Sequence, residues 1–308
     1  MQDTIFALST SIGQSGVAVI RISGSEVLNV YSILTHKEQP KERFAQYNKI
    51  YDEYGIEKAQ QYYKANTQAL NLYKEMCKSI DCDFEIKDAV VYSVNRSDRI
   101  NAEMEALNKI KADFEYVKEL ELPFSVAGAI KFKHQAQFNP LKFIKEICKG
   151  LNIYENTKVL AFDGEGYLTE NGRVTANKTV VATHFPIFNK FGLYPLKLYQ
   201  NRSYVIALEN AKDVNGMYID ENENGLSFRN YKNLLLLGGG SHRTGKQGGS
   251  FKELRVFKNH YYPYSKEVTR WATQDCISLD KIPYIGQYSK TSPQIFVATG
   301  YNKWGMTS

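Results

Sequence analysis

The fold is decided by Ile295-Phe-Val-Ala-Thr-Gly-Tyr-Asn-Lys-Trp-Gly-Met-Thr-Ser308, at the carboxyl end of the sequence. Its first four residues are apolar and favour extended backbone, so they predict a buried strand, and Thr299-Gly300 predicts a tight exit from that strand. The residues that follow would begin a helix. A strand, a glycine turn and a helix in this order are typical of α/β proteins. We therefore expect an α/β fold in which the chain leaves a sheet at Gly300.

A second informative segment, Thr157 to Phe185, has the order strand, hairpin, strand and then Val180-Val-Ala-Thr183. Within it, Asn171-Gly172 is a strong signal for a hairpin turn. The small Ala182-Thr183 step would let the backbone approach a bound molecule closely. Taken alone, the same step also fits an ordinary buried strand that ends in Ala-Thr.

The rest of the chain predicts a mixture of strands and helices. The first 24 residues alternate apolar and polar positions, which predicts a β-hairpin. Ser97 is expected to cap its helix, and Leu141, Ile144 and Cys148 are expected to share an apolar helix face. Strands are predicted at 88–94, 124–132 and in a β-rich region at 202–237 that ends in Leu234-Leu-Leu-Leu237, and helices at 25–34, 56–77, 97–114 and 141–151.

Composition narrows the class of protein. With 308 residues, of which 43% are hydrophobic, the chain can fill a packed core and form two domains. No apolar run reaches roughly eighteen residues and the amino terminus lacks a secretory pattern, so we expect a cytoplasmic protein without a membrane partner. The net charge of +6 comes without a basic block, which argues against direct nucleic-acid binding. The four cysteines show neither metal-ligand nor disulfide spacing, so we expect no metal and reduced structural thiols.

One motif resembles a phosphate-binding loop. Gly240-Ser-His-Arg-Thr-Gly245-Lys246 fits G-x-x-x-x-G-K after a hydrophobic strand. A nucleoside-triphosphate site needs a Ser or Thr next, followed at once by a helix, whereas Gln247-Gly-Gly249 follows here. The pattern therefore indicates an ordinary loop, with a helix delayed to about Ser250.

Residues 47–308 resemble the FAD-dependent glycine/D-amino-acid oxidase (DAO) superfamily, in particular its bacterial branch associated with a Rieske iron–sulfur domain. Seven stretches in the same order carry the resemblance, namely Gln135–Pro140, Val180–Pro186, Gln200–Tyr204, Leu237–Gly245, Trp271–Asp275, Asp280–Gly286 and Gly300–Met306. The resemblance implies a β-rich substrate domain beside an FAD-binding fold. It also implies that FAD accepts a hydride from the C–N bond of a small-molecule amine or amino acid, with no acid/base residue assigned.

The resemblance also implies roles for individual residues. Tyr204 and Arg229 would bind the substrate carboxylate, although either could equally be a packing or surface residue. The residues implied to lie near the flavin are Ala182, Thr183, Gly286, Gly300, Tyr301, Asn302, Lys303 and Gly305.

Departures from the family are equally informative. The family opens with a strand, G-x-G-x-x-G and a helix, which hold the FAD pyrophosphate, and no G-x-G-x-x-G occurs between Met1 and Ser308. We therefore expect an incomplete FAD/NAD(P)-binding fold, truncated at both ends, that binds FAD weakly. In place of that opening, Asp3 to Gly24 resembles the folate-binding and dimerising amino terminus of the tRNA-modification GTPase family TrmE/MnmE.

The two resemblances predict two domains, a TrmE-like fragment at 1–46 and the DAO-like domain at 47–308, with a seam between residues 36 and 54. The leading hypothesis is an impaired flavin-dependent amine or amino-acid oxidoreductase. Two alternatives stay open. One is a folate-binding or dimerisation module of tRNA modification, and the other is a non-catalytic remnant of a gene fusion.

Overall fold

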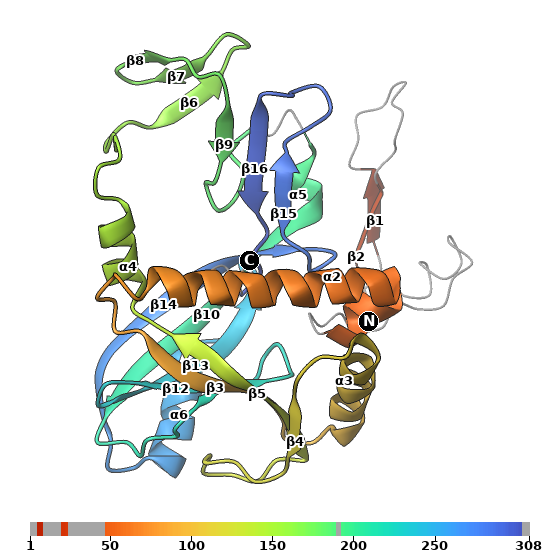
Figure 1. Ribbon diagram of the computed structural model, residues 1–308, viewed down its shortest axis with the longest axis vertical. Coiled ribbons are helices and arrows are strands. Elements are labelled where there is room, and N and C mark those ends of the chain that lie inside the picture. Colours follow the sequence, from red (N-terminus) through yellow and green to blue (C-terminus); the bar gives the residue numbers. More distant parts are fainter. Residues whose placement is uncertain (1–4, 9–19, 24–46, 189–191, 304–308) are drawn as a thin grey trace. The chain divides into compact units, whose positions relative to one another are not determined.

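The computed structural model describes residues 5–8, 20–23, 47–188 and 192–303 (Figure 1). The chain divides into two compact units, Met1–Arg43 and Phe44–Ser308. In the first, β1 (Ile5–Leu8) and β2 (Ile20–Ser23) pair antiparallel, with Ile5 opposite Ser23. This pairing confirms the predicted hairpin. The helix predicted at 25–34 lies outside the described residues.

The second unit is built on an eight-stranded sheet with the order β14-β10-β13-β12-β11-β3-β5-β4 (Figure 1). Its neighbours pair antiparallel except β11 and β3, which run parallel. The strands are β3 (Glu85–Ser93), β4 (Glu115–Val117), β5 (Gly128–Gln137), β10 (Leu198–Glu209), β11 (Met217–Asp220), β12 (Ser227–Tyr231), β13 (Leu234–Arg243) and β14 (Lys266–Ser278). The predicted β-rich region and the Leu234–Leu237 strand are confirmed.

Side-chain alternation gives this sheet two distinct faces. Phe228, Ile206 and Leu237 lie directly opposite one another across β12, β13 and β10, and all three pack with Leu254 of α6 (Phe251–Tyr261) in one core. We call this side the α6 face. The residues next to them along each strand therefore point to the other side, which we call the opposite face.

Helices α2 (Tyr47–Met76) and α3 (Ser97–Ile110) pack beside β5, where Ala59, Ile100, Leu107 and Ile130 share a second core. The break in α2 falls at Gly55, whose φ of 78° favours glycine, so the helix predicted from Ile56 is confirmed. The capping role predicted for Ser97 is wrong. Arg96 occupies the cap without a side-chain hydrogen bond, and Ser97 is the first helical residue.

Helix α4 (Pro140–Ile147) begins where predicted, because Asn139 accepts hydrogen bonds from the N–H groups of Leu141 and Lys142. Its predicted apolar face is wrong. Phe143 is the buried residue, while Leu141 is 78% and Ile144 44% exposed. The helix turns Phe143 inward because its ring meets those of Tyr73 and Phe138, at centroid distances of 5.4 and 5.3 Å.

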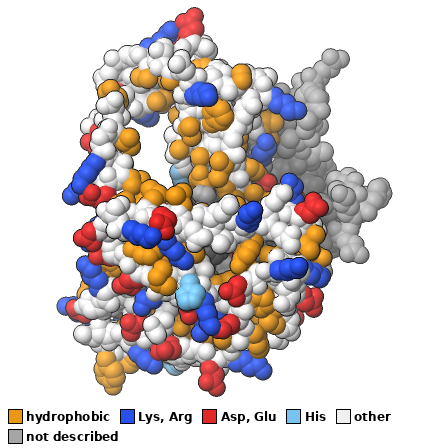
Figure 2. Space-filling view, in the orientation of Figure 1, with side chains coloured by type: hydrophobic (Ala, Val, Ile, Leu, Met, Phe, Trp, Pro, Cys, Tyr) orange, Lys and Arg blue, Asp and Glu red, His pale blue; other side chains and the backbone are white. Residues whose placement is uncertain are grey.

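Two small sheets complete the second unit. One joins β6 (Val159–Phe162), β7 (Tyr167–Thr169) and β8 (Gly172–Val174), and the predicted hairpin turn at Asn171-Gly172 is confirmed. The other has the order β15-β16-β9, from β15 (Tyr284–Gln287), β16 (Ile295–Thr299) and β9 (Thr179–Val181). Its outer face leaves Val180 61% and Ile285 63% exposed, and Figure 2 shows hydrophobic side chains gathered over this region.

The strand predicted at 124–132 instead begins at Gly128 and runs to Gln137 as β5. Phe124 precedes the strand because its ring packs against Phe257 of α6, with centroids 5.8 Å apart. Among the described residues, no helix is both long and apolar enough to cross a membrane.

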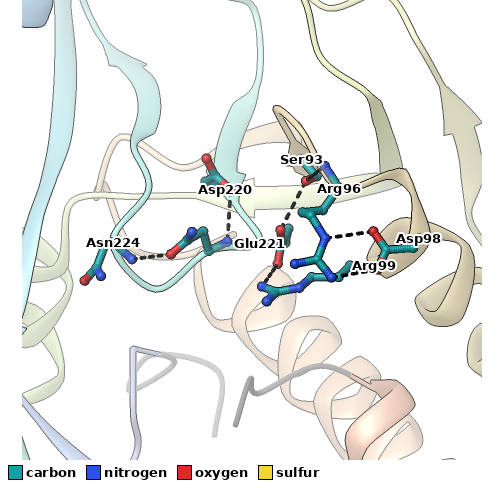
Figure 3. A network of polar contacts seen from close by, with 8 residues as sticks. Ser93, Arg96, Asp98, Arg99, Asp220, Glu221 and Asn224 are labelled. Carbon is teal, nitrogen blue, oxygen red and sulfur yellow. Dashed lines mark hydrogen bonds and ion pairs between the residues drawn. The ribbon is translucent and has the colours of Figure 1, made fainter. Parts of the chain in front are cut away.

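A network of polar contacts connects the end of β11 to the start of α3 (Figure 3). Glu221, whose side chain is 2% exposed, accepts hydrogen bonds from Ser93 Oγ at 3.1 Å and from Arg99 at 2.9 Å. Its neighbour Asp220 accepts one from the backbone N–H of Asn222 at 2.9 Å. Burial raises the pKa of Asp220 to about 6, assisted by the charge of Glu221.

The raised pKa of Asp220 makes stability depend on pH. An unfolded aspartate titrates near ~4, so the folded protein holds this proton more tightly. The free energy of unfolding should fall as the pH rises from about 4 to about 6. We expect Asp220→Asn, which can keep the bond to Asn222, to raise the free energy of unfolding at pH 7.5 by about 1–2 kcal/mol, a figure reduced for solvent contact, and to flatten this dependence. Urea unfolding at several pH values measures the free energy of unfolding and its pH dependence.

The control is Asp213→Asn, because exposed Asp213 accepts the same kind of turn bond from Asn215 N–H at 2.7 Å. This variant should leave the pH dependence unchanged. An Asp220→Asn protein that follows the wild-type pH curve would exclude Asp220 as its source.

Candidate cofactor and substrate site

The three-stranded sheet brings two distant segments together at one edge. Strands β9 and β16 run parallel, with Thr179 opposite Ile295 and Val181 opposite Val297. Their carboxyl ends therefore meet at the same edge, which is where open α/β sheets bind ligands. Ala182 and Thr183 leave β9 there, and Gly300 leaves β16 beside them. The structure thus joins these predicted site residues.

The two predicted glycines differ in their surroundings. Gly300 has a φ of 73°, and a Cβ on it would lie 3.1 Å from the Leu198 side chain, so the tight exit predicted here requires glycine. Gly286 lies on β15 opposite Val297, two residues back from the edge, and a Cβ on it would meet nothing within 4 Å. Gly305 lies outside the described residues.

The segment after β16 is fastened to the end of β14. Tyr301 forms an isolated bridge with Ile277, and the backbone N–H of Asn302 donates to the Cys276 carbonyl at 3.0 Å. The buried Asn302 side chain accepts from the Ser278 backbone N–H at 3.2 Å and donates to the Lys281 carbonyl at 2.8 Å. Asn302 therefore fixes the segment in place, and its side-chain amide is occupied by protein groups.

Lys303 extends from this segment to the opposite face of the large sheet. Its Nζ donates to Ser241 Oγ at 2.9 Å, and Ser241 lies 3.1 Å from Ser203 Oγ. Ser203 alternates with the α6-facing Tyr204, which places this contact on the opposite face. Burial lowers the pKa of Lys303, while the charge of Asp275 acts in the other direction.

Two further residues that the sequence reasoning did not assign lie on the same face. Asn201 of β10 and Asp275 of β14 are direct cross-strand partners. Each lies two residues along its strand from the Ser203–Thr273 pair, and therefore on the same face. Asn201 is 9% exposed, and its Oδ1 is a buried atom for which the described residues supply no hydrogen-bond donor. Desolvation raises the pKa of Asp275, opposed by the charges of Lys303 and His184.

The predicted substrate residues Tyr204 and Arg229 are not brought together. Tyr204 lies on the α6 face, where its ring stacks on His242 at 5.8 Å and meets Phe251 edge-on at 4.9 Å. Arg229 follows the α6-facing Phe228, so it points to the opposite face, and it remains exposed although desolvation lowers its pKa. The two side chains point to opposite faces because Tyr204 is two residues from the α6-facing Ile206, whereas Arg229 is one residue from the α6-facing Phe228.

The phosphate-loop pattern forms part of a strand. Gly238 to Arg243 belong to β13 and pair with β10, and the next helix, α6, begins at Phe251 with Ser250 as its cap. The pattern therefore lacks the loop-to-helix geometry that a phosphate site needs. No cluster of three or more metal-ligating side chains occurs within the described ranges.

This arrangement fits the ring end of a flavin, whereas the described residues around it supply no group for the pyrophosphate. The edge is formed by exposed Ala182 and Thr183 and by the turn at Gly300. Small residues at such an edge let a ligand approach the backbone closely. The sequence contains no G-x-G-x-x-G. In the part of the chain that the structure describes, no helix of two turns or more follows β9 or β16 directly.

Comparisons with known proteins agree with this geometry. The profile of the family described as FAD dependent oxidoreductase (DAO) matches residues 34–308. A Bacillus subtilis (strain 168) protein, YhfW, named as a Rieske 2Fe-2S iron–sulfur protein, is 32% identical over 95% of this chain, which spans 62% of that relative. Glycine oxidase from Geobacillus kaustophilus matches in structure, with a TM-score of 0.66, 18% identity, and 79% of this chain and 74% of that one covered.

A separate, short match accounts for the other resemblance. The tRNA modification GTPase MnmE of Anaplasma marginale (strain St. Maries) is 52% identical over 50 residues, which are 16% of this chain and 11% of that protein. The short match and the long one thus describe different relatives of a single chain.

Proposed function

Because the chain belongs to the FAD-dependent oxidoreductase (DAO) family, we propose that it acts in the flavin-dependent oxidation of a C–N bond in a small amine or amino acid. When bound, FAD supplies a two-electron acceptor for the hydride that leaves the substrate carbon. The supporting observation is that Asp275 and Lys303 meet on the opposite face of the sheet, where the end of β14 is joined to the exit of β16. Arg229 lies on the same face, farther along the sheet.

Arg229 is the proposed carboxylate-binding residue. Its side chain is exposed and carries no ion pair among the described residues. Partial desolvation lowers its pKa, and a guanidinium forms strong charge-assisted hydrogen bonds with a carboxylate. We propose it in preference to Tyr204, whose ring packs against α6.

Asp275 and Asn201 are proposed as an alternative position for the substrate ammonium group, because they lie six residues along β14 and β10 from the level of Arg229 and do not share one small substrate with it. An amine must lose a proton before its carbon can release a hydride, because the nitrogen lone pair stabilises the developing cation. The raised pKa of Asp275 suits a proton acceptor, and the unpartnered Oδ1 of Asn201 can accept a hydrogen bond from the same nitrogen. Lys303 is proposed to keep Asp275 ionised before substrate binds.

The experiment is anaerobic reduction of excess FAD by matched compounds, followed as loss of flavin absorbance. N-methylglycine should reduce FAD, whereas butyrate, which lacks the nitrogen, and dimethylamine, which lacks the carboxylate, should not. A panel of other amino acids extends the test. Reduction by 2-hydroxy acids or glycerol phosphate, with none by any amine, would contradict the proposal.

Arg229→Met should raise KM for a carboxylated amine about ten- to hundredfold, the equivalent of one charge-assisted bond worth ~1.5–3 kcal/mol. The control is Arg202→Met, because exposed Arg202 lies on the α6 face. Steady-state kinetics with excess FAD measures both. Equal KM values in Arg229→Met and wild type would remove Arg229 from the substrate site.

The short match to MnmE supports a second candidate, folate binding by the amino-terminal segment. Titration of the full chain with 5-formyltetrahydrofolate tests it. A micromolar affinity that survives the Arg229 and Asp275 variants would favour this alternative, and the absence of binding would exclude it.

A further inference from the structure

Two cysteines, Cys77 and Cys82, lie in contact at the end of α2. The Sγ atoms of Cys77 and Cys82 are 3.5 Å apart, and both residues are buried, with 9% and 1% exposure. Cys77 follows the last residue of α2, and Cys82 precedes β3 by three residues. The sequence suggested isolated thiols because a Cys-x4-Cys spacing matches no common metal or redox motif.

The backbone holds each cysteine in place. The Cys77 N–H donates to the Tyr73 carbonyl at 2.9 Å, and the Cys82 carbonyl accepts from the Asn139 N–H at 2.7 Å. The pair lies in an aromatic cluster in which the rings of Tyr73, Phe138 and Phe143 meet at 5.3 to 5.4 Å. These rings shield the sulfurs from bulky reagents, whereas a molecule as small as hydrogen peroxide needs only a local opening.

We propose that Cys77 and Cys82 form an oxidative modification site, at which a peroxide converts the two thiols to an intrachain disulfide. One cysteine gives up its proton and attacks the peroxide as a thiolate. The O–O bond breaks, the attacked oxygen stays on sulfur as a sulfenic acid, and the other oxygen takes up a proton and leaves as an alcohol or water. The second thiol then displaces the sulfenic hydroxyl as water and forms the S–S bond. Two S–H bonds are broken, two electrons pass to the peroxide, and both protons leave in the products.

Geometry makes this pair suitable for the reaction. The sulfurs must close from 3.5 Å to a bond of about 2 Å, a movement that side-chain rotation and the short turn between the residues can supply. Cys148 is only partly buried, and Cys276 is near Thr299 Oγ1 at 3.5 Å, with no second thiol beside either in the described structure. The inference does not depend on the proposed oxidation of amines.

The surroundings also set the rate. Burial raises the pKa of Cys77 to about 12, with the Cys82 thiol adding to the shift. A thiolate reacts with peroxide and a thiol does not, so oxidation should be slow near neutrality and should accelerate as the pH rises. Burial also raises the pKa of neighbouring Tyr73, with the charge of Cys77 adding to the shift.

The test treats the purified full chain with hydrogen peroxide at pH 7 and pH 8.5, then alkylates the denatured protein and maps its tryptic peptides. Trypsin cuts after Lys78, between the two cysteines, so a disulfide will link two peptides that reduction separates. We expect this linked species, a mass loss of about 2 Da and two alkylated thiols instead of four, with faster formation at pH 8.5. The oxidised protein should melt a few degrees higher, because a short loop is closed.

Cys148→Ser is the matched control and should form the linked peptide at the wild-type rate. Cys82→Ser should not form it, with circular dichroism confirming its fold. If neither variant folds, the wild-type peptide map alone decides. Four free thiols after prolonged peroxide treatment, a linkage between other cysteines, or sulfinic acid at either position would overturn the proposal.

Discussion

A protein of these 308 residues is expected to bind FAD no more tightly than it binds riboflavin, and to be purified without stoichiometric flavin. We propose that the edge formed by β9 and β16 contacts the ring system. The FAD pyrophosphate carries two negative charges, and the sequence lacks the G-x-G-x-x-G turn that would hydrogen-bond them. Each charge-assisted bond is worth about 1.5–3 kcal/mol, so losing three weakens binding by roughly three to six orders of magnitude.

The measurement is quenching of flavin fluorescence in parallel titrations with riboflavin, FMN and FAD. Similar dissociation constants are expected for all three, because the phosphates and the adenosine add no contact. Gly300→Val should weaken the three equally, since its side chain would strain the turn at φ 73° and crowd Leu198. An FAD affinity a hundredfold above that of riboflavin would show that this chain does hold the pyrophosphate.

Loss of the Glu221 carboxylate, directly after β11, should strongly destabilise the second unit. Glu221→Ala removes a 2%-exposed side chain that accepts from Ser93 and forms an ion pair with Arg99 at 2.9 Å (Figure 3). Losing a buried hydrogen-bond acceptor of this kind costs about 1–3 kcal/mol. Urea unfolding should show a lower midpoint with an unchanged slope. Glu221→Gln, which keeps its shape and the bond from Ser93, should lose less.

A second ion pair in the same network supplies the control. Asp98 forms two hydrogen bonds with Arg96 at 2.9 and 2.8 Å, but these side chains are 64% and 53% exposed. Asp98→Ala should therefore lower the free energy of unfolding far less than Glu221→Ala does. Equal losses in the Glu221 and Asp98 variants would mean that burial does not determine the strength of these pairs.

The sequence predicted local elements better than it predicted contacts. Hydrophobic spacing located α2, β13 and β16, because each of these elements buries apolar side chains, whereas Pro140 located the start of α4. The sequence also placed Ala182 and Gly300 at strand exits. Which residues share a face depends on the pairing of strands, and nothing in the sequence states that Asn201 lies opposite Asp275. For the same reason, nothing in the sequence states that Tyr204 and Arg229 lie on opposite faces of the sheet.

The same limit applies to the cysteines. Cys77 and Cys82 meet because the chain turns between α2 and β3 and because Asn139 holds the Cys82 carbonyl. Neither contact leaves a signature in the sequence. Asp275 and Asn201 lie in stretches that resemble the DAO superfamily, so that resemblance could have directed attention to them, but only the pairing of β10 with β14 places them together.

Asn302 connects the small sheet that contains β16 to the large sheet that contains β14. Its hydrogen bonds to Ser278, Lys281 and Cys276 fasten the exit of β16 to the end of β14. A displacement at the edge of the small sheet must therefore be transmitted to the strand that carries Asp275. Affinity for the electron acceptor and affinity for the electron donor would then rise and fall together, so that selection on one property would constrain the other.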